Sequence, residues 1–215
     1  MKNRIVQSLL LVGMMVSLSA SSFKESVPRS NNLNTEIETE HIENTEVTIV
    51  TKEEALAEMA TNQMTKELEM LSSISNKKEW FLQYKDIVNK YSYILDAPET
   101  VYEYYTEDEI YLMQRVIETE CFDQSFESKV NVAAIVLNRI ESEKFGNSVR
   151  EVIIEPKQFV YWRQNITEDT VLALEYSFEI EDTTGGCVAF RSDEKVSKWG
   201  SWTYQFSDGA HYFYK

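Results

Sequence analysis

The sequence predicts an α+β protein in which helices come first and a small antiparallel sheet follows. Apolar residues recur at spacings of three and four through most of residues 77–180, as they do on the buried face of a helix. The period then changes to strict alternation in "SWTYQFSDGAHYFYK", which turns at Asp208 and Gly209 and predicts a hairpin. The sequence shows no βαβ alternation, internal repeat or Gly-rich phosphate loop, so a parallel nucleotide-binding sheet is not expected.

Residues 1–22 have the pattern of a secretory signal peptide. Lys2 and Arg4 give a positive start, residues 9–18 are apolar, and small residues at 19–22 form a cleavage zone. The apolar stretch is shorter than the ~20 residues of a membrane span. We therefore expect a secreted, extracytoplasmic protein. An uncleaved signal anchor is the alternative, and it would be the protein's one contact with a membrane.

The next part of the chain is predicted to pass from a linker into helices. Residues 23–51 are polar and acidic without apolar periodicity, which is typical of a disordered linker. Residues 52–75 consist of good helix formers with a ragged apolar stripe, and self-association through that stripe is an option. The stripe consists of Leu56, Met59, Gln63, Leu68 and Leu71. Residues 77–95 predict a second helix, closed by Pro98. Together, residues 52–100 are predicted to form a helical N-terminal region.

Residues 101–215 are predicted to form the compact domain. Thr106 and Glu109 make a capping box that starts a helix through "TEDEIYLMQRVIETE". The buried face of this helix comprises Ile110, Met113, Val116 and Ile117. A second helix is expected from about residue 127 to residue 140, where the apolar stripe includes small alanines that allow close approach of another helix.

Two further helices and a strand complete the predicted domain. A short helix begins with a capping box at Ser148 and Glu151 and stops at Pro156. The segment "TEDTVLALEYSFEI" predicts another helix, with Thr167 as its cap. A Gly-Gly turn in "TTGGCVAF" precedes a short apolar run, which predicts the first strand of the sheet.

Charge and composition exclude several classes of function. The net charge is −15, from 21 basic and 36 acidic residues, which argues against nucleic acid and anionic lipid as partners because both carry negative charge. Of the two histidines, His41 lies in the predicted linker, so a zinc site with several histidines is not available and neither metal nor cofactor is expected. Cys121 and Cys187 are compatible with one bridge or with two free thiols. The sequence leaves the oligomeric state open.

Glu120 is the carboxyl with the most notable position. It follows Val116 by four residues and Ile117 by three, so it extends the buried face of its helix. Burial raises the pKa of a carboxyl, and an acid that stays protonated near neutral pH can donate a proton to a glycosidic oxygen. A solvated or paired surface residue is the plainer alternative. Asp123 and Glu127 are nearby acids, interpreted first as a turn former and as a residue that compensates the helix dipole.

A Cys/His pair is the alternative nucleophilic site, because some cell-wall peptidases use one. Cys121 with His211 would be that pair. Cys121 follows the end of a helix, where the dipole disfavours a thiolate, and it adjoins Glu120. The pattern therefore favours a small semi-buried thiol over a nucleophile.

Four segments in this order resemble the SleB/CwlJ-type cell wall hydrolases, which include spore-cortex-lytic enzymes. They are "ETECFDQSFESKVNVAAIVLNRI", "KFGNSVREVIIEPKQF", "TEDTVLALEYSFEIEDTTGGCVAF" and "GAHYFYK". Gln158 and Phe159 stand in the family's characteristic place, and His211 and Phe213 form its closing His-x-Phe. The resemblance covers residues 106–215. Each segment is weak by itself, but their order and spacing together make the resemblance specific.

The resemblance implies a lysozyme-like catalytic domain that cleaves peptidoglycan glycan strands between N-acetylmuramic acid and N-acetylglucosamine. It implies that Glu120 is the catalytic acid. A lytic transglycosylase needs only that residue and leaves 1,6-anhydro ends, whereas a muramidase needs a second carboxylate. Two positions depart from the family pattern: Asp123-Gln124 replaces a common Gly-Glu pair, and Ser192-Asp193 replaces Asn-Pro. These departures leave open a non-catalytic peptidoglycan-binding or envelope-assembly protein on the same fold.

The resemblance also suggests which residues contact substrate. The expected set is Gln158, Phe159, Tyr161, Gly186 and His211. Gln158 can hydrogen-bond an N-acetyl group, with a turn-stabilising role as the alternative. His211 alternates with Phe213 on the last strand and can line a cleft, with a satisfied core histidine as the alternative. Tyr161, Trp162 and Trp199 offer aromatic faces for sugar stacking, with core packing as the alternative.

Overall fold

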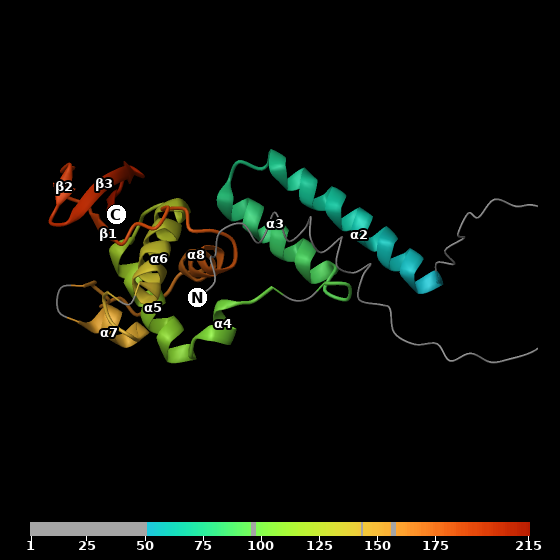
Figure 1. Ribbon diagram of the computed structural model, residues 1–215, viewed down its shortest axis with the longest axis horizontal. Helices are drawn as coiled ribbons and strands as arrows, with labels where there is room; N and C mark the ends of the chain where they lie inside the picture. The colour runs from blue at the N-terminus through green and yellow to red at the C-terminus, as the bar shows by residue number, and fades with distance from the viewer. Residues whose placement is uncertain (1–50, 96–97, 143, 156–157) are drawn as a thin grey trace, which may run out of the picture.

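The structure is a computed structural model that describes residues 51–95, 98–142, 144–155 and 158–215. Figure 1 shows a helical hairpin at one end, a group of helices in the middle and a small sheet at the other end. The predicted signal peptide, residues 1–22, and the predicted linker up to residue 50 lie outside the described residues. Among the described helices, none combines the length and apolar character needed to cross a bilayer.

The N-terminal hairpin consists of α2 (Lys52–Met70), a 3₁₀ turn η1 (Leu71–Ser73) and α3 (Lys77–Lys90). Its own small core contains Met64, Leu71, Ile87 and Tyr91. The start of the predicted apolar stripe faces outward, with Leu56 55% and Met59 68% exposed. The helix α3 ends at Lys90, well before the predicted stop at Pro98, because Tyr91 leaves the helical conformation at φ −104° and ψ 13°.

The helix α3 packs on the outer side of the middle helices. Phe81 is fully buried there and meets the ring of Tyr176 edge to face, with ring centroids 5.3 Å apart. The shared cluster also contains Val130, Leu172, Ala173 and Ile180. Ion pairs from Lys78 to Asp169 and from Lys85 to Glu175, each at 2.5 Å, flank this contact. The hairpin is thus joined to the rest of the molecule by an apolar contact with a charged rim.

The middle of the molecule contains α4 (Val101–Tyr104), α5 (Glu107–Glu120), α6 (Phe126–Glu141), α7 (Val149–Ile154) and α8 (Glu168–Glu179). The helix α6 is central: every side chain from residue 128 to residue 137 is buried. It packs against α5, α7 and α8, and its fully buried alanines, Ala133 and Ala134, let the neighbouring backbones come close. The end of α5 lies beside the first turn of α6, where Glu118 faces Lys129 and the Cys121 sulfur donates to the Ser128 carbonyl.

One of the two predicted capping boxes in the domain is confirmed in full. Thr106 accepts from the amide of Glu109, whose carboxylate accepts from the amide of Thr106. Ser148 likewise accepts from the amide of Glu151, at 3.2 Å. The second half of that box is wrong, because the Glu151 carboxylate accepts from the amide of Asn147, at 2.6 Å, one residue outside the expected partner.

The sheet contains β1 (Ala189–Arg191), β2 (Lys198–Trp199), β3 (Trp202–Ser207) and β4 (Tyr212–Tyr214). All pairs are antiparallel and the strand order is β1-β4-β3-β2. The predicted hairpin is confirmed as β3 and β4, with Gly209 in its turn at φ 94°. Phe213 packs with Ile135 of α6 and Cys187, which fixes the sheet to the helices. The predicted α+β class, mainly helical with a C-terminal antiparallel sheet, is confirmed.

Candidate active site

Glu120 is the last residue of α5, and the segment that follows α7 runs back along this helix. The Val160 amide donates to Oε1 of Glu120 at 2.8 Å, and the Arg163 amide donates to Oγ1 of Thr119 at 3.1 Å. Farther along, the Arg115 side chain donates to the Arg163 carbonyl at 3.1 Å. These contacts hold one oxygen of the Glu120 carboxyl in a fixed place. Within the described part of the chain, no hydrogen bond reaches the other oxygen, Oε2.

The surroundings of Glu120 favour its protonated form. Burial raises the pKa of the Glu120 carboxyl, while the Val160 amide and the positive charge of Arg139 oppose this rise without cancelling it. An acid with a raised pKa and one free oxygen is suited to donate a proton. The sequence expectation of a partly buried carboxyl at this helix end agrees with the geometry.

Glu120 opens onto a cleft of about 450 Å³ with aromatic walls. The cleft is lined by Glu120, Arg139, Phe145, Gln158, Phe159, Val160, Phe190, Trp199 and Trp202. The rings of Phe145 and Trp202 stack with centroids 6.3 Å apart, and Trp199 meets Trp202 edge to face at 5.5 Å. Broad aromatic faces beside a carboxyl are the composition expected of a sugar-binding cleft.

Arg139 links the floor of the cleft to the sheet. Its guanidinium lies 4.3 Å from the ring centre of Phe159 and 4.8 Å from that of Phe145. Its Nε donates to the Val188 carbonyl at 2.6 Å, and one terminal nitrogen donates to Oε1 of Gln158 at 2.8 Å. Burial lowers the pKa of Arg139 to about 10, so it keeps its charge at neutral pH. Arg139 is thus a cleft residue that the sequence analysis did not propose.

The structure brings some of the expected substrate residues together and separates others. Gln158 and Phe159 line the cleft with Glu120, although the Gln158 carbonyl oxygen is already held by Arg139. Gly186 lines a neighbouring hollow rather than the cleft. Tyr161 lies outside the lining of both and packs on the helical core, beneath the guanidinium of Arg115 at 5.5 Å.

His211 is buried behind Glu120 instead of facing the cleft. Only 4% of it is exposed, and its ring lies close to the backbone of Glu120. Burial lowers the pKa of His211, although the Asp208 carboxylate 4.0 Å away opposes this. Asp208 is itself anchored by the amides of Ala210 and His211. The alternation of His211 with Phe213 predicted that His211 lines the cleft. Because the Asp208 carboxylate binds the amides of the turn, the His211 ring instead packs at the end of α5.

Neither of the nearby acids considered as a second catalytic carboxylate lies in the cleft. Asp123 is exposed in the turn after α5 and adopts φ 59°, which agrees with the turn-forming interpretation. Glu127 is in the first turn of α6 and lies 4.0 Å from the ammonium of Lys77. Within the described residues, Glu120 is the one carboxylate that lines the cleft.

Glu118, two residues before Glu120, was missed by the sequence analysis. It is 2% exposed and faces Lys129 of α6 at 3.4 Å. The hydroxyls of Thr167 and Thr170 also donate to its Oε2. Thr167 therefore occupies the predicted cap position of α8 without making a side-chain capping bond. Burial would raise the pKa of Glu118, but the two threonines and Lys129 hold it at about 2.

The cysteines do not form a nucleophilic site or a bridge. Cys121 and Cys187 are both free and buried. Burial raises the pKa of the Cys121 thiol, and the charges of Asp208 and Glu120 raise it further. Its sulfur donates to the Ser128 carbonyl at 3.5 Å. Because the thiolate is the reactive form, this environment argues against the Cys/His peptidase alternative.

Comparison with known proteins identifies relatives of the C-terminal part of the chain. Residues 123–214 match the cell wall hydrolase family, so the match begins three residues after Glu120. A spore cortex-lytic enzyme of Bacillus cereus is 33% identical over 107 residues, covering 46% of this chain and 40% of that protein. A spore cortex-lytic enzyme of Oceanobacillus iheyensis is 38% identical over 55 residues, covering 26% of this chain and 20% of that protein. The resemblance to SleB/CwlJ-type cell wall hydrolases is confirmed, although the chain spans well under half of these relatives.

Two solved structures are each similar to about half of the chain. The catalytic domain of the Bacillus cereus SleB protein is 28% identical, with a TM-score of 0.47, and the match covers 52% of this chain and 92% of that one. The catalytic domain of the germination-specific lytic transglycosylase SleB from Bacillus anthracis is also 28% identical, with a TM-score of 0.46, covering 52% and 97%.

Proposed function

We propose that this chain is an exported enzyme that cleaves the glycan strands of peptidoglycan, because residues 123–214 match the cell wall hydrolase family. The observation that supports this most directly is Glu120, a carboxyl with a raised pKa set in an aromatic cleft. The bond cleaved is that between N-acetylmuramic acid and N-acetylglucosamine. The predicted signal peptide would deliver the enzyme to the cell wall, where this polymer lies.

The proposed reaction is that of a lytic transglycosylase with one acid/base residue. Glu120, protonated on Oε2, gives its proton to the glycosidic oxygen as the bond from that oxygen to muramyl C1 breaks. The resulting carboxylate then takes the proton of the muramyl C6 hydroxyl, whose oxygen bonds to C1. The products are a free hydroxyl on N-acetylglucosamine and a 1,6-anhydro muramyl end, and Glu120 is protonated again. A hydrolase of either stereochemistry would use a second carboxylate in the cleft, and Asp123 and Glu127 lie outside it.

The cleft walls supply the sugar contacts in this proposal. Trp199 and Trp202 offer faces on which sugar rings stack, with Phe145 continuing the same wall. Gln158 retains its amide hydrogens for an N-acetyl carbonyl, since Arg139 occupies only its carbonyl oxygen. Phe159 and the Arg139 guanidinium form the floor. His211 acts as a positioning residue, because its buried ring lies close to the backbone of Glu120 at the end of α5.

The products of digestion test the reaction type. We expect purified protein to release soluble muropeptides whose muramyl ends carry the 1,6-anhydro ring. Mass spectrometry detects these ends because they lack one water molecule, about 18 Da, relative to the reducing ends that hydrolysis would give. Reducing muramyl ends would instead identify a muramidase, and reducing N-acetylglucosamine ends would place the cut at the other bond.

The pH dependence of cleavage tests the protonation state of Glu120. The free enzyme must carry the proton, and burial raises the pKa of Glu120 above its ordinary value of 4.5. The protonated fraction therefore persists to higher pH and is lost only as the pH rises through the raised pKa. We expect kcat/KM to fall along an alkaline limb whose midpoint lies above pH 4.5. A midpoint at or below that pH would contradict a desolvated general acid.

A non-catalytic peptidoglycan-binding or envelope-assembly protein is the second candidate. The Asp123-Gln124 pair, where many relatives have Gly-Glu, favours it. Such a protein would bind insoluble peptidoglycan without releasing fragments. The digestion experiment separates the two candidates directly, because the same sample is assayed for bound protein and for soluble products.

A further inference from the structure

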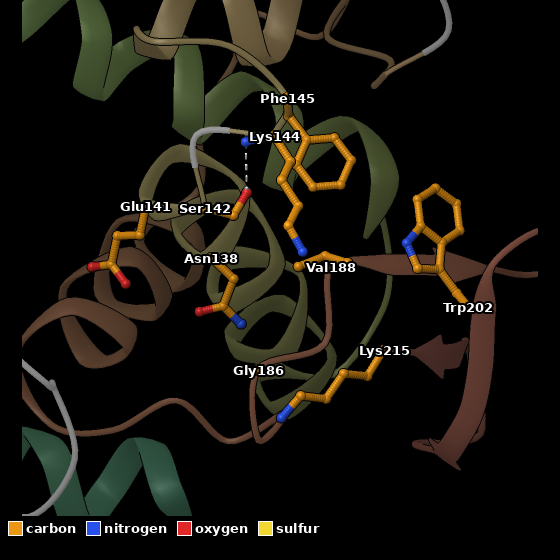
Figure 2. A pocket seen from close by; sticks show the side chains of 9 residues that line it. All are labelled: Asn138, Glu141, Ser142, Lys144, Phe145, Gly186, Val188, Trp202 and Lys215. Atoms are coloured by element: carbon orange, nitrogen blue, oxygen red, sulfur yellow. Dashed lines mark hydrogen bonds between the residues drawn. The ribbon is translucent and has the colours of Figure 1, made fainter.

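A second hollow of about 350 Å³ opens beside the cleft that contains Glu120. Phe145 and Trp202 line both spaces, so the hollow adjoins the cleft. Figure 2 shows the hollow between the end of α6, the loop that carries Gly186 and the sheet. A polymer that lies in the cleft therefore has room for a side branch here.

The hollow carries positive charge in an otherwise acidic chain. Lys144 and Lys215 both line it, and in Figure 2 the Lys144 ammonium ends beside Val188 while the Lys215 side chain runs along the other edge to the loop that carries Gly186. Glu141 also lines the hollow, but its carboxylate lies at the far side, beyond Asn138, in the same view. The chain as a whole has a net charge of −15. Two ammonium groups on the lining of one hollow are a local exception in that setting, and they suit an anionic ligand.

The loop at the base of the hollow holds Lys215 in place. Its Nζ donates to the Gly185 carbonyl at 2.7 Å, which leaves two of its hydrogens for a ligand. A Cβ on Gly186 would lie 3.0 Å from that nitrogen, and Gly186 adopts φ 84°, so a larger residue would displace the lysine. This gives the Gly-Gly pair of the sequence a role in shaping the hollow.

The opposite wall is rigid. The Asn138 amide donates to Oδ2 of Asp182 at 3.1 Å and to the Cys187 carbonyl at 2.9 Å, which ties the loop to α6. Asp182 in turn accepts from the Gly186 amide at 2.6 Å. The hollow is thus preorganised by hydrogen bonds that involve no ligand.

We propose that this hollow binds the peptide side chain of the glycan through a carboxylate held by Lys144 and Lys215. The inference rests on the proposed function, which places the glycan backbone in the adjoining cleft. Muramyl residues carry short peptides with free carboxyl groups, and a space of about 350 Å³ accommodates a few residues of such a chain. The hollow then selects strands that bear an anionic peptide close to the bond that is cut.

The test compares two forms of one substrate. Purified peptidoglycan is used as isolated and after its carboxyl groups have been converted to neutral amides. We expect the Lys144→Ala/Lys215→Ala variant to lose about tenfold in kcat/KM on the native polymer, as two weak ion pairs would give together. On the amidated polymer the variant and the wild type should agree within about twofold. The Lys144→Arg/Lys215→Arg variant should keep the wild-type preference, since it keeps both charges.

The matched control removes two lysines far from the hollow. Lys52 and Lys66 are exposed on α2, and Lys52→Ala/Lys66→Ala should behave as wild type on both polymers. The inference is wrong if the Lys144→Ala/Lys215→Ala variant matches wild type on native polymer, or loses equally on both. Loss of the native fold is checked by thermal unfolding and is separated from the charge effect by the arginine variant.

A binding measurement separates failure of this inference from failure of the proposed function. The Glu120→Gln variant, with and without the two alanine substitutions, is cosedimented with native and with amidated peptidoglycan. Weaker binding of the triple variant to native polymer alone supports the hollow as a carboxylate site even if wild-type protein releases no fragments. Equal binding of both variants to native polymer contradicts the inference whatever the turnover.

Discussion

Replacing Glu120 by Gln is expected to reduce the rate of peptidoglycan solubilisation by about 10²–10⁴-fold, the usual range for removal of a general acid or base. Glutamine keeps the shape of the side chain and can still accept the Val160 hydrogen bond, now 2.8 Å long. It cannot give a proton to the leaving oxygen or take one from the C6 hydroxyl. The rate of release of soluble muropeptides, measured at matched protein concentrations, gives the loss.

Two nearby acids supply the controls for this substitution. Asp123 is exposed in the turn and Glu127 is half-solvated near Lys77. Asp123→Asn and Glu127→Gln should retain the wild-type rate within about twofold, because neither carboxyl lines the cleft. Wild-type activity in Glu120→Gln would refute the mechanism, and a large loss in Asp123→Asn or Glu127→Gln would point to a hydrolase with a second carboxylate.

Replacing Glu118 by Gln is expected to lower the free energy of unfolding by about 3–5 kcal/mol, the cost of leaving a buried charge without its partner. The unpaired charge would be Lys129, whose side chain is buried in α6. The hydroxyls of Thr167 and Thr170, which donate to the carboxylate, would also lose a charged acceptor. Urea unfolding of the variant and the wild type measures the difference.

The pH dependence of stability provides a second readout for Glu118. Its pKa is about 2 in the folded protein, against an ordinary value of 4.5. A depressed pKa contributes stability that is fully present above pH 4.5 and is lost as the pH falls from 4.5 through 2. Wild type should lose this contribution over that interval, while Glu118→Gln should not.

The double variant Glu118→Gln/Lys129→Met removes both charges together. It should recover much of the lost stability, because replacing a buried ion pair by neutral side chains of similar size is often close to neutral. Glu120→Gln should leave the urea midpoint nearly unchanged, since burial already disfavours the charged form of that carboxyl. Equal stability of Glu118→Gln and wild type would show that the ion pair contributes nothing net.

The contrast between these two acids shows how far the sequence could predict the site. Glu120 was identified because its spacing from Val116 and Ile117 extends an apolar stripe, which is information within one helix. Glu118 lies two residues away, about 200° around the helix. The helical period therefore predicts that it faces solvent, opposite the apolar stripe. Its burial depends on Lys129, Thr167 and Thr170, which are distant in sequence. A lysine directly before the apolar run of α6 was the only available signal.

The positions of Arg139 and His211 were beyond the sequence for a similar reason. The order of the helices and the C-terminal hairpin follow from local periodicity and turn residues, and both are confirmed. Arg139 enters the cleft only because β1 and the segment after α7 meet on the end of α6. His211 turns inward because the Asp208 carboxylate binds the amides of the turn, a contact that strict alternation along a strand does not anticipate.

Because β2 is short, the cleft wall that it forms should open locally more easily than the wall that holds Glu120. Trp199 lies on an exposed strand of two residues, in which Lys198 pairs with Thr203 and Trp199 with Trp202. The wall that holds Glu120 belongs to the half-buried ends of α5 and α6. Opening of an exposed, sparsely bonded strand costs far less free energy than global unfolding. We therefore expect Trp199 and its strand to move when a bulky glycan strand binds, while the Glu120 carboxyl stays in position. Substrate binding and proton transfer would then depend on different parts of the domain.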